Sequence, residues 1–163
     1  FRRVLFRSNA NSYQKASWFL HMLRTDLGDG LFFKGLQKYY SDFQNSTALT
    51  EDFKKIMEQV SGKNLNLFFQ QWLWQAGHPI LDLKWKQNSN KKLSINISQT
   101  QIDPFTFPVE IEILMTNGSK FYKTFKISDK ESKFKIQLNE KVVAIQLDPS
   151  VKLLFEEVKS VNN

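Results

Sequence analysis

The spacing of apolar residues changes once along the chain, at Gly77-His78-Pro79. Before this point, apolar residues recur three and four positions apart, which is the period of an amphipathic helix. After it, they alternate with polar residues, as in a half-buried strand. A chain of 163 residues is long enough for one large domain or two small ones. A run of helices followed by a run of strands predicts an α+β fold, with a helical part over residues 9–77 and a strand-rich part over residues 78–163.

Four helices fit the first part, and capping residues and glycines predict their ends. The expected helices run from Asn11 or Ser12 to Gly28, from after Asp29 to the loop at Gln44, from a cap at Thr50 to Gly62, and from about Asn64 to Gln75 with Gly77 beyond. Connections this short predict that consecutive helices pack as neighbours in a short antiparallel bundle.

The second part contains six runs in which apolar and polar residues alternate. The inward positions are expected at Leu81, Leu83 and Trp85; Leu93, Ile95 and Ile97; Val109, Ile111 and Ile113; Phe121, Phe125 and Ile127; Phe134, Ile136 and Leu138; and Val143, Ile145 and Leu147. Asn117-Gly118 predicts a hairpin, because both residues tolerate the positive φ angles of a type I′ turn. Short strands separated by turn residues predict an antiparallel β-sandwich.

Composition excludes some kinds of site. The chain has no cysteine, so it contains no disulfide, thiolate zinc site or thiol nucleophile. Its apolar runs are far shorter than the roughly 20 residues that span a bilayer, so we expect no membrane span. The net charge of +7 includes three arginines in the first eight residues, and the lysines are scattered along the rest. We interpret them as a solvated surface and expect no nucleic-acid partner.

Residues 1–8 have no helical or strand period that continues into the first expected helix. The segment Arg2–Ser8 can be encoded by AGA CGT GTG CTC TTC CGA TCT, which resembles the end of a common sequencing adapter. We therefore expect residues 1–8 to be a non-native sequencing-adapter scar, joined to a reading frame that is cut at its 5′ end.

Few residues of the chain fit a catalytic or metal-binding pattern. His21 and His78 are its two histidines, and neither has a metal-ligand spacing. We interpret His21 as a packing residue on an apolar helix and His78 as a hinge residue held extended by Pro79. No carboxylate has a neighbour that would tune it for acid–base chemistry, and no serine lies in a nucleophile elbow.

Tyr13 is the one candidate site residue. It falls in the first turn of the first expected helix, where backbone N–H groups are unpaired. By position alone, a packing tyrosine is the plainer interpretation, so the functional one depends on the residues around it.

The segment Tyr13–Arg24 closely resembles the tyrosine helix of the gluzincin aminopeptidases, the aminopeptidase N family, in which Tyr-x-Lys-Gly precedes an apolar helix. The resemblance continues in order and spacing to about residue 80, through Leu27-Gly28-Asp29, Phe32-Phe33-Lys34-Gly35-Leu36, Tyr39-Tyr40, Thr50-Glu51-Asp52-Phe53, Met57-Glu58, Ser61-Gly62, Phe68-Phe69-Gln70-Gln71-Trp72 and Gly77-His78-Pro79. The remainder is similar to the β-sandwich domain of that family, and Gln146-Leu147-Asp148-Pro149 fits its end.

This resemblance implies a fold and a function. The helices would be the second half of a thermolysin-like catalytic domain, followed by an immunoglobulin-like sandwich. The parent protein would be a zinc aminopeptidase that acts on peptide substrates. Tyr13 would donate its hydroxyl to the oxyanion formed when a zinc-bound water attacks the first peptide carbonyl.

The chain also departs from the family. Ala16 stands where the family usually has glycine, and the chain lacks the His-Glu-x-x-His motif, the downstream glutamate ligand and the Gly-x-Met-Glu-Asn segment. We expect these in a missing N-terminal, zinc-bearing half on which the helices would pack. The fragment itself is then expected to be inactive. Two alternatives remain open: a non-catalytic scaffold or binding relative of the same fold, and a free-standing adhesion or sugar-binding module.

Overall fold

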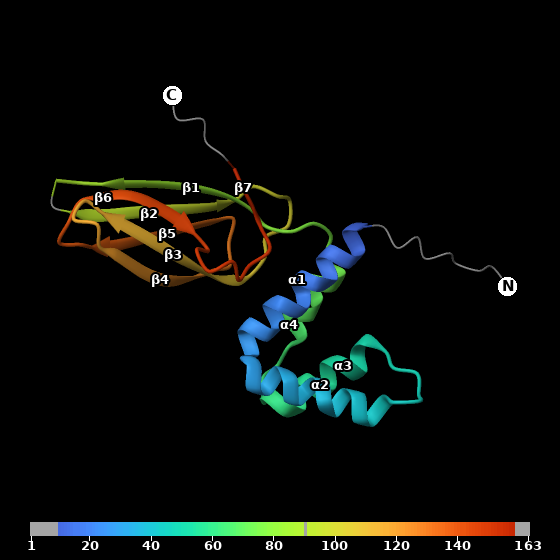
Figure 1. Ribbon diagram of the computed structural model, residues 1–163. Coiled ribbons are helices and arrows are strands. Elements are labelled where there is room, and N and C mark those ends of the chain that lie inside the picture. The colour runs from blue at the N-terminus through green and yellow to red at the C-terminus, as the bar shows by residue number, and fades with distance from the viewer. Residues whose placement is uncertain (1–9, 90, 159–163) are drawn as a thin grey trace. The chain divides into compact units, whose positions relative to one another are not determined.

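The computed structural model of the protein describes residues 10–89 and 91–158 (Figure 1). The chain divides after Ala76 into two compact units, the first helical and the second built of strands. The expected change from helices to strands is therefore confirmed. Residues 1–8, for which we expect a foreign origin, lie outside the described residues.

The helical unit contains four α-helices and one π-helix. Their bounds are α1 Ala10–Leu27, α2 Asp29–Phe43, α3 Thr50–Ser61, α4 Asn66–Phe69 and the π-helix η1 Gln70–Trp74. Gly28 and Gly62 end α1 and α3 as expected. Both have positive φ angles, and their N–H groups donate to the carbonyls of Arg24 and Glu58.

Two details of the helices differ from the expectation. Thr50 is the first residue of α3, whereas Leu49 is its cap, and the N–H of Leu49 donates to the carboxylate of Asp52 at 2.9 Å. The fourth helix is a short α-helix that widens into η1 and ends where the Gln75 N–H donates to the Gln70 carbonyl. Adjacent residues of a π-helix are separated by a smaller angle than those of an α-helix, so Gln71 and Trp72 are both buried.

Phe69 lies at the centre of the helical core and is fully buried. Its ring lies 5.0 Å from that of Phe19 on α1 and 6.2 Å from that of Phe53 on α3. The apolar side chains buried in this unit are Phe19, Met22, Leu23, Leu27, Phe32, Ile56, Met57, Leu65, Phe69 and Trp72. They come from all five helices, so the apolar stripes predicted from the sequence meet in one core.

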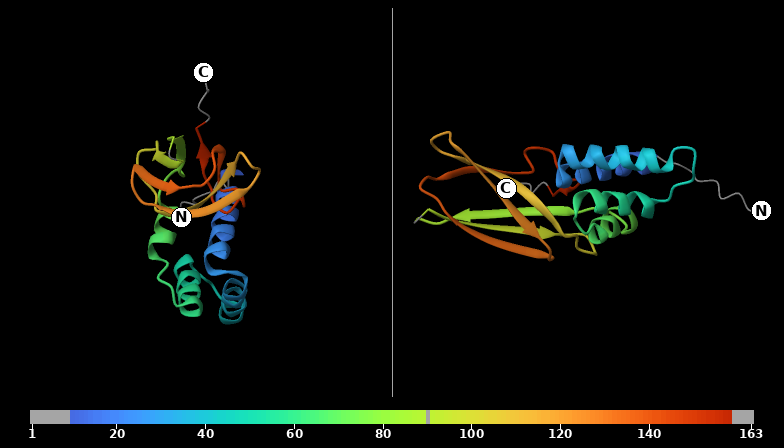
Figure 2. Two further views of the ribbon diagram at one scale, coloured as in Figure 1. Left: turned by 90° about the vertical axis from the view of Figure 1, so that its left-hand side faces the viewer. Right: turned by 90° about the horizontal axis from the view of Figure 1, so that it is seen from below.

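The second unit is a sandwich of two sheets (Figure 2). Its strands are β1 Ile80–Gln87, β2 Lys92–Gln99, β3 Phe107–Met115, β4 Lys120–Ile127, β5 Glu131–Gln137, β6 Val142–Leu147 and β7 Glu156–Glu157. One sheet has the order β5-β2-β1-β7 and the other β4-β3-β6. The six expected strands are present and pair antiparallel. The seventh, β7, was not expected, and it pairs parallel to β1.

Alternation along the strands predicted which side chains face the other sheet. Ile95, Ile97, Ile111 and Ile113 are almost completely buried, and Phe134 of one sheet stacks on Phe125 of the other with ring centroids 4.0 Å apart. Trp85 and Val143 are less buried than expected, with 37% and 55% of their surfaces exposed. Val143 lies where the pairing of β3 with β6 shifts register. Alternation shows only which way a side chain faces, whereas burial also depends on what lies opposite.

The hairpin at Asn117-Gly118 is present, but its turn is not type I′. Among the described residues of this turn only Gly118 has a positive φ, and its N–H donates to the carbonyl of Met115. The carboxamide oxygen of Asn117 accepts from the N–H and hydroxyl of Ser119. This is the pattern of a three-residue loop that ends in a left-handed glycine, so the loop is one residue longer than expected.

Candidate functional site

Tyr13 lies in the first turn of α1 with 68% of its surface exposed. Within the described part of the chain its phenolic hydroxyl has no hydrogen-bond partner. The Tyr13 carbonyl accepts the Ser17 hydroxyl at 2.9 Å, inside the same helix. Tyr13 is therefore not a core packing residue, and its donor is free to reach a group outside the described structure.

The helix that carries Tyr13 is held by its apolar side. Leu23 is fully buried and Phe19 is 4% exposed. The Phe19 ring lies 5.3 Å from that of Phe68 and 5.0 Å from that of Phe69, so α1 packs on α4 where it joins η1. Close packing of these three aromatic rings fixes the position of the helix axis, and with it the position of Tyr13.

Lys15 anchors the same turn. Its Nζ donates to the carbonyl of Gln75 at 3.0 Å, directly after η1. The last carbonyls of a helix lack intrahelical donors and lie at the negative end of the helix dipole, so a lysine stabilises them. Partial burial lowers the pKa of Lys15. The Tyr-x-Lys motif drew attention to Lys15, but only the structure shows that Lys15 contacts Gln75.

Ala16, which stands where the related family has glycine, is exposed in the helix. Its methyl group therefore does not enter the core, and α1 continues through this position without interruption.

The two histidines do not come together in a metal site. His21 is exposed, and its ring packs edge-on against the Trp18 ring at 5.5 Å. It is therefore a packing residue at the surface of the helix and not in the core. His78 lies in the other unit, where its Nε2 is 2.8 Å from a carboxylate oxygen of Glu156. Among residues 10–89 and 91–158, no three His, Cys, Asp or Glu side chains are grouped so as to hold a metal ion. The zinc implied by the resemblance does not fit these residues.

Several large apolar side chains on the helical unit are exposed. They are Tyr13, Leu20, Leu31, Phe33, Tyr40, Leu49, Leu67 and Trp74. Among them, Phe33 and Tyr40 of α2 are 45% and 72% exposed. The apolar surface of these helices is wider than the core they form. Separately, no helix in the described residues is both long and apolar enough to cross a bilayer.

Comparison with known proteins shows which family the helical unit resembles. Residues 5–72 match the Peptidase family M1 domain. Over this segment, the helical unit is similar to part of a peptidase family M1 domain. This confirms the resemblance inferred from the Tyr13–Arg24 segment and the motifs that come after it.

The relatives that this chain resembles are aminopeptidases. Aminopeptidase N of Lactococcus lactis is 38% identical over 69 residues, which are 42% of this chain and 8% of the relative. Aminopeptidase N of Escherichia coli is 30% identical over 65% of the chain and 13% of the relative. Puromycin-sensitive aminopeptidase of Caenorhabditis elegans is 27% identical over 77% of the chain and 14% of the relative. The chain thus spans a small fraction of the length of these proteins.

A solved structure extends the likeness to both units. The crystal structure of Legionella pneumophila aminopeptidase A, in complex with aspartic acid, matches with a TM-score of 0.77 and 20% identity. The match covers 94% of this chain and 18% of that one. It confirms the α+β fold, a helical bundle followed by a β-sandwich, for this chain.

Proposed function

We propose that this chain is part of a zinc metallo-aminopeptidase that removes N-terminal residues from peptides, and that Tyr13 stabilises the tetrahedral oxyanion. The observation that carries the proposal is the Tyr13 hydroxyl, which is exposed and has no partner within residues 10–89 and 91–158, at the start of a helix in the M1-matching segment. The aminopeptidase activity of the relatives supports the reaction class.

The zinc of such a parent, bound by residues outside this chain, would polarise the peptide carbonyl and supply an activated water. The contribution of this chain is a hydrogen bond. As the carbonyl carbon becomes tetrahedral, negative charge develops on its oxygen, and Tyr13 donates its O–H to that oxygen. A phenolic hydroxyl donates at neutral pH without losing its proton.

Such a donor works only if it is already in position when the charge forms. The Lys15–Gln75 hydrogen bond and the packing of Phe19 on Phe68 and Phe69 hold the first turn of α1. We therefore assign Lys15 as a positioning residue for Tyr13. The exposed apolar side chains of the helical unit suit packing on a zinc-bearing part of the same parent protein.

The test is Tyr13→Phe in the full-length parent enzyme. Removing one oxyanion donor costs about 3–4 kcal/mol of barrier, so kcat should fall roughly 100-fold or more while zinc content stays the same. Steady-state kinetics on an aminoacyl p-nitroanilide, with zinc measured by atomic emission, checks both. Tyr40→Phe is the matched control, because Tyr40 is a comparably exposed tyrosine, on α2, and should leave kcat unchanged. An undiminished kcat in Tyr13→Phe contradicts the role.

The 163-residue chain by itself is expected to have no aminopeptidase activity, because its described residues form no metal site. The same p-nitroanilide assay with added zinc checks this, with the full-length parent as the positive control. Zinc-dependent turnover by the isolated chain would contradict the assignment of the zinc ligands to residues outside it.

A further inference from the structure

The lysines of the sandwich are less scattered than the sequence suggested. Strand register brings five of them to the outer face of the four-stranded sheet, on β1, β2 and β5: Lys84, Lys86, Lys92, Lys133 and Lys135. Asp82 and Glu131 are the acidic residues that these three strands place on that face, and they pair with Lys84 and Lys133 at 2.7 and 3.1 Å. Lys86, Lys92 and Lys135 have no ion-pair partner among the described residues.

The outer face of the three-stranded sheet is different. There Lys120 pairs with Glu112 at 3.0 Å, and Lys152 pairs with Glu110 at 3.1 Å. On the described strands, the lysines without an ion-pair partner are Lys86, Lys92 and Lys135 on the outer face of the four-stranded sheet, against Lys123 and Lys126 on β4. Unneutralised positive charge is therefore densest on the outer face of the four-stranded sheet.

The outer face of β1, β2 and β5, with its five lysines, is called the lysine face below. A hollow of about 280 Å³ lies in the middle of it. It forms because the central strand β2 carries the short side chains of Ser94 and Asn96, while the strands on both sides carry lysines. Lys84 and Lys133 lie opposite Asn96, and Lys86 and Lys135 lie opposite Ser94. All the lining residues come from β1, β2 and β5, so the hollow opens away from the other sheet.

Asn96 adds a second observation. Its Oδ1 is buried and accepts no hydrogen bond, and its Nδ2 makes one long contact of 3.4 Å with the Ser98 hydroxyl. A buried acceptor without a donor is unfavourable, and it marks a place where a ligand N–H group would be stabilised. Lysine stems are flexible, so they can move aside to admit such a donor.

We propose that this hollow binds an extended acidic peptide segment of another protein. Its carboxylates would pair with the lysines on β1 and β5, an apolar side chain would lie between the lysine stems, and a peptide N–H would donate to Asn96. Strands two apart in a sheet are separated by about 10 Å, which accommodates one extended chain. Phosphate groups of a nucleic acid or lipid match the charge but offer no donor for Asn96.

The test uses the 163-residue chain captured on a biosensor surface, so that it cannot self-associate. The probe is the peptide Glu-Asp-Phe-Glu-Asp, and its neutral counterpart is Gln-Asn-Phe-Gln-Asn. The acidic peptide should bind and the neutral one should not. Lys86→Glu/Lys135→Glu should weaken binding about tenfold, because it replaces two attractive charges with repulsive ones.

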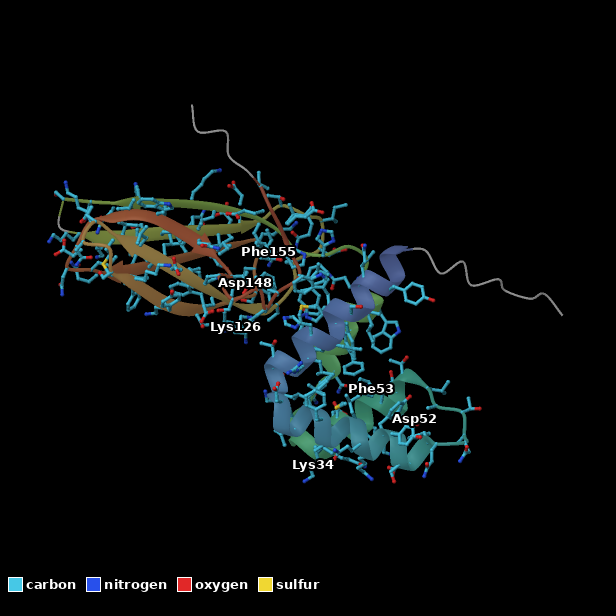
Figure 3. The ribbon with its side chains drawn as sticks, viewed as in Figure 1. Lys34, Asp52, Phe53, Lys126, Asp148 and Phe155 are labelled. Carbon is cyan, nitrogen blue, oxygen red and sulfur yellow. The ribbon has the colours of Figure 1, made fainter. Side chains whose placement is uncertain are left out.

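Lys34→Glu/Lys126→Glu is the matched control. It changes the net charge equally, at exposed lysines on α2 and on β4 (Figure 3), and should alter affinity less than twofold. Asn96→Leu should weaken peptide binding several-fold while raising Tm, because it removes the unpaired acceptor. Circular dichroism confirms that each variant folds.

Three results would overturn the proposal. The first is an equal loss of affinity in the two double variants, which would indicate a general charge effect. The second is equal binding of the neutral peptide. The third is stronger binding to single-stranded oligothymidylate or to phosphatidylserine vesicles than to the acidic peptide, with no effect of Asn96→Leu.

Discussion

At the scale of single residues, two positions in one helical turn have different roles. Residues two apart on an α-helix point about 200° away from each other. Tyr13 is therefore exposed, while Lys15 reaches back to the carbonyl of Gln75. A residue that must act on a substrate and the residue that holds it in place can thus share one turn.

Glu110 shows how one carboxylate links separate parts of the sandwich. It accepts the Ser150 hydroxyl at 2.8 Å and Lys152 Nζ at 3.1 Å, both from the segment after β6. Nearby, Asp148 accepts the N–H groups of Lys152 and Leu153 at 2.8 Å each (Figure 3). The hydrogen bonds from Ser150 and then Lys152 lower the pKa of Glu110.

A folded-state pKa below the unfolded value stabilises the protein above the unfolded pKa, and this stabilisation is lost as pH falls through the folded-state pKa. Glu110→Gln should therefore lower the free energy of unfolding by up to about 1 kcal/mol at pH 7. The difference from wild type should shrink at acid pH, from about pH 5 downwards. Urea denaturation at pH 7 and at pH 3.5 measures it.

Ser150→Ala is the comparison variant, because it removes only one of the two donors. It should show the same pH trend with a smaller amplitude. If the difference between Glu110→Gln and wild type were the same at both pH values, the ionised form of Glu110 would not be the stabilising one.

At the scale of elements, the contact between α2 and α3 depends on a glycine. Gly35 is buried in the middle of α2 and faces Met57 of α3, which is fully buried. A Cβ at position 35 would lie 2.4 Å from Met57 Sδ and 3.0 Å from its Cε. A side chain at position 35 would therefore force the buried side chain of Met57 to move.

Gly35→Ala should destabilise the chain by about 1–2 kcal/mol. Overpacking a buried methionine costs about 1–3 kcal/mol, and the better helix propensity of alanine offsets up to about 1 kcal/mol of that. Thermal and chemical denaturation measure the change. Gly30→Ala in the same helix is the control, because no atom lies within 4 Å of its added Cβ, and it should be neutral or stabilising.

A double-mutant cycle makes this prediction specific. In a Met57→Ala background, Gly35→Ala should cost less than it does in the wild type, because the clashing atoms are gone. Equal costs in the two backgrounds would show that the contact with Met57 is not the cause.

At the scale of the whole molecule, the two units differ in how completely they bury apolar surface. In the sandwich, most inward positions of both sheets cover each other, and three of its described large apolar side chains, Ile102, Val143 and Val151, are more than half exposed. In the described part of the helical unit, five are more than half exposed: Tyr13, Tyr40, Leu49, Leu67 and Trp74. Exposed apolar surface of this extent favours association, either with another part of a parent protein or between copies of the chain.

The isolated chain is therefore expected to self-associate as its concentration rises, as measured by sedimentation velocity. Tyr40→Gln/Leu67→Gln should shift the distribution toward monomer. Ile102→Gln is the control, because Ile102 is 88% exposed but lies on the sandwich, and it should have little effect. Equal effects of the helical and sandwich variants would show that the helical surface is not the site of association.

The sequence by itself determined the order of elements, because the apolar period and the end signals at Gly28 and Gly62 are local properties of the chain. It also predicted the inward side of each strand and, through the motifs that begin at Tyr13, the family. The role of Tyr13 and its zinc partner stays a proposal, because it depends on residues outside the described structure.

Only the tertiary structure decided which residues meet. The Lys15–Gln75 hydrogen bond joins positions 60 residues apart, and the parallel pairing of Ile80 with Glu156 joins positions still more distant. The lysine face exists because register aligns three strands, although each strand by itself shows only ordinary alternation. Contacts of this kind depend on packing between elements, which a local pattern does not contain.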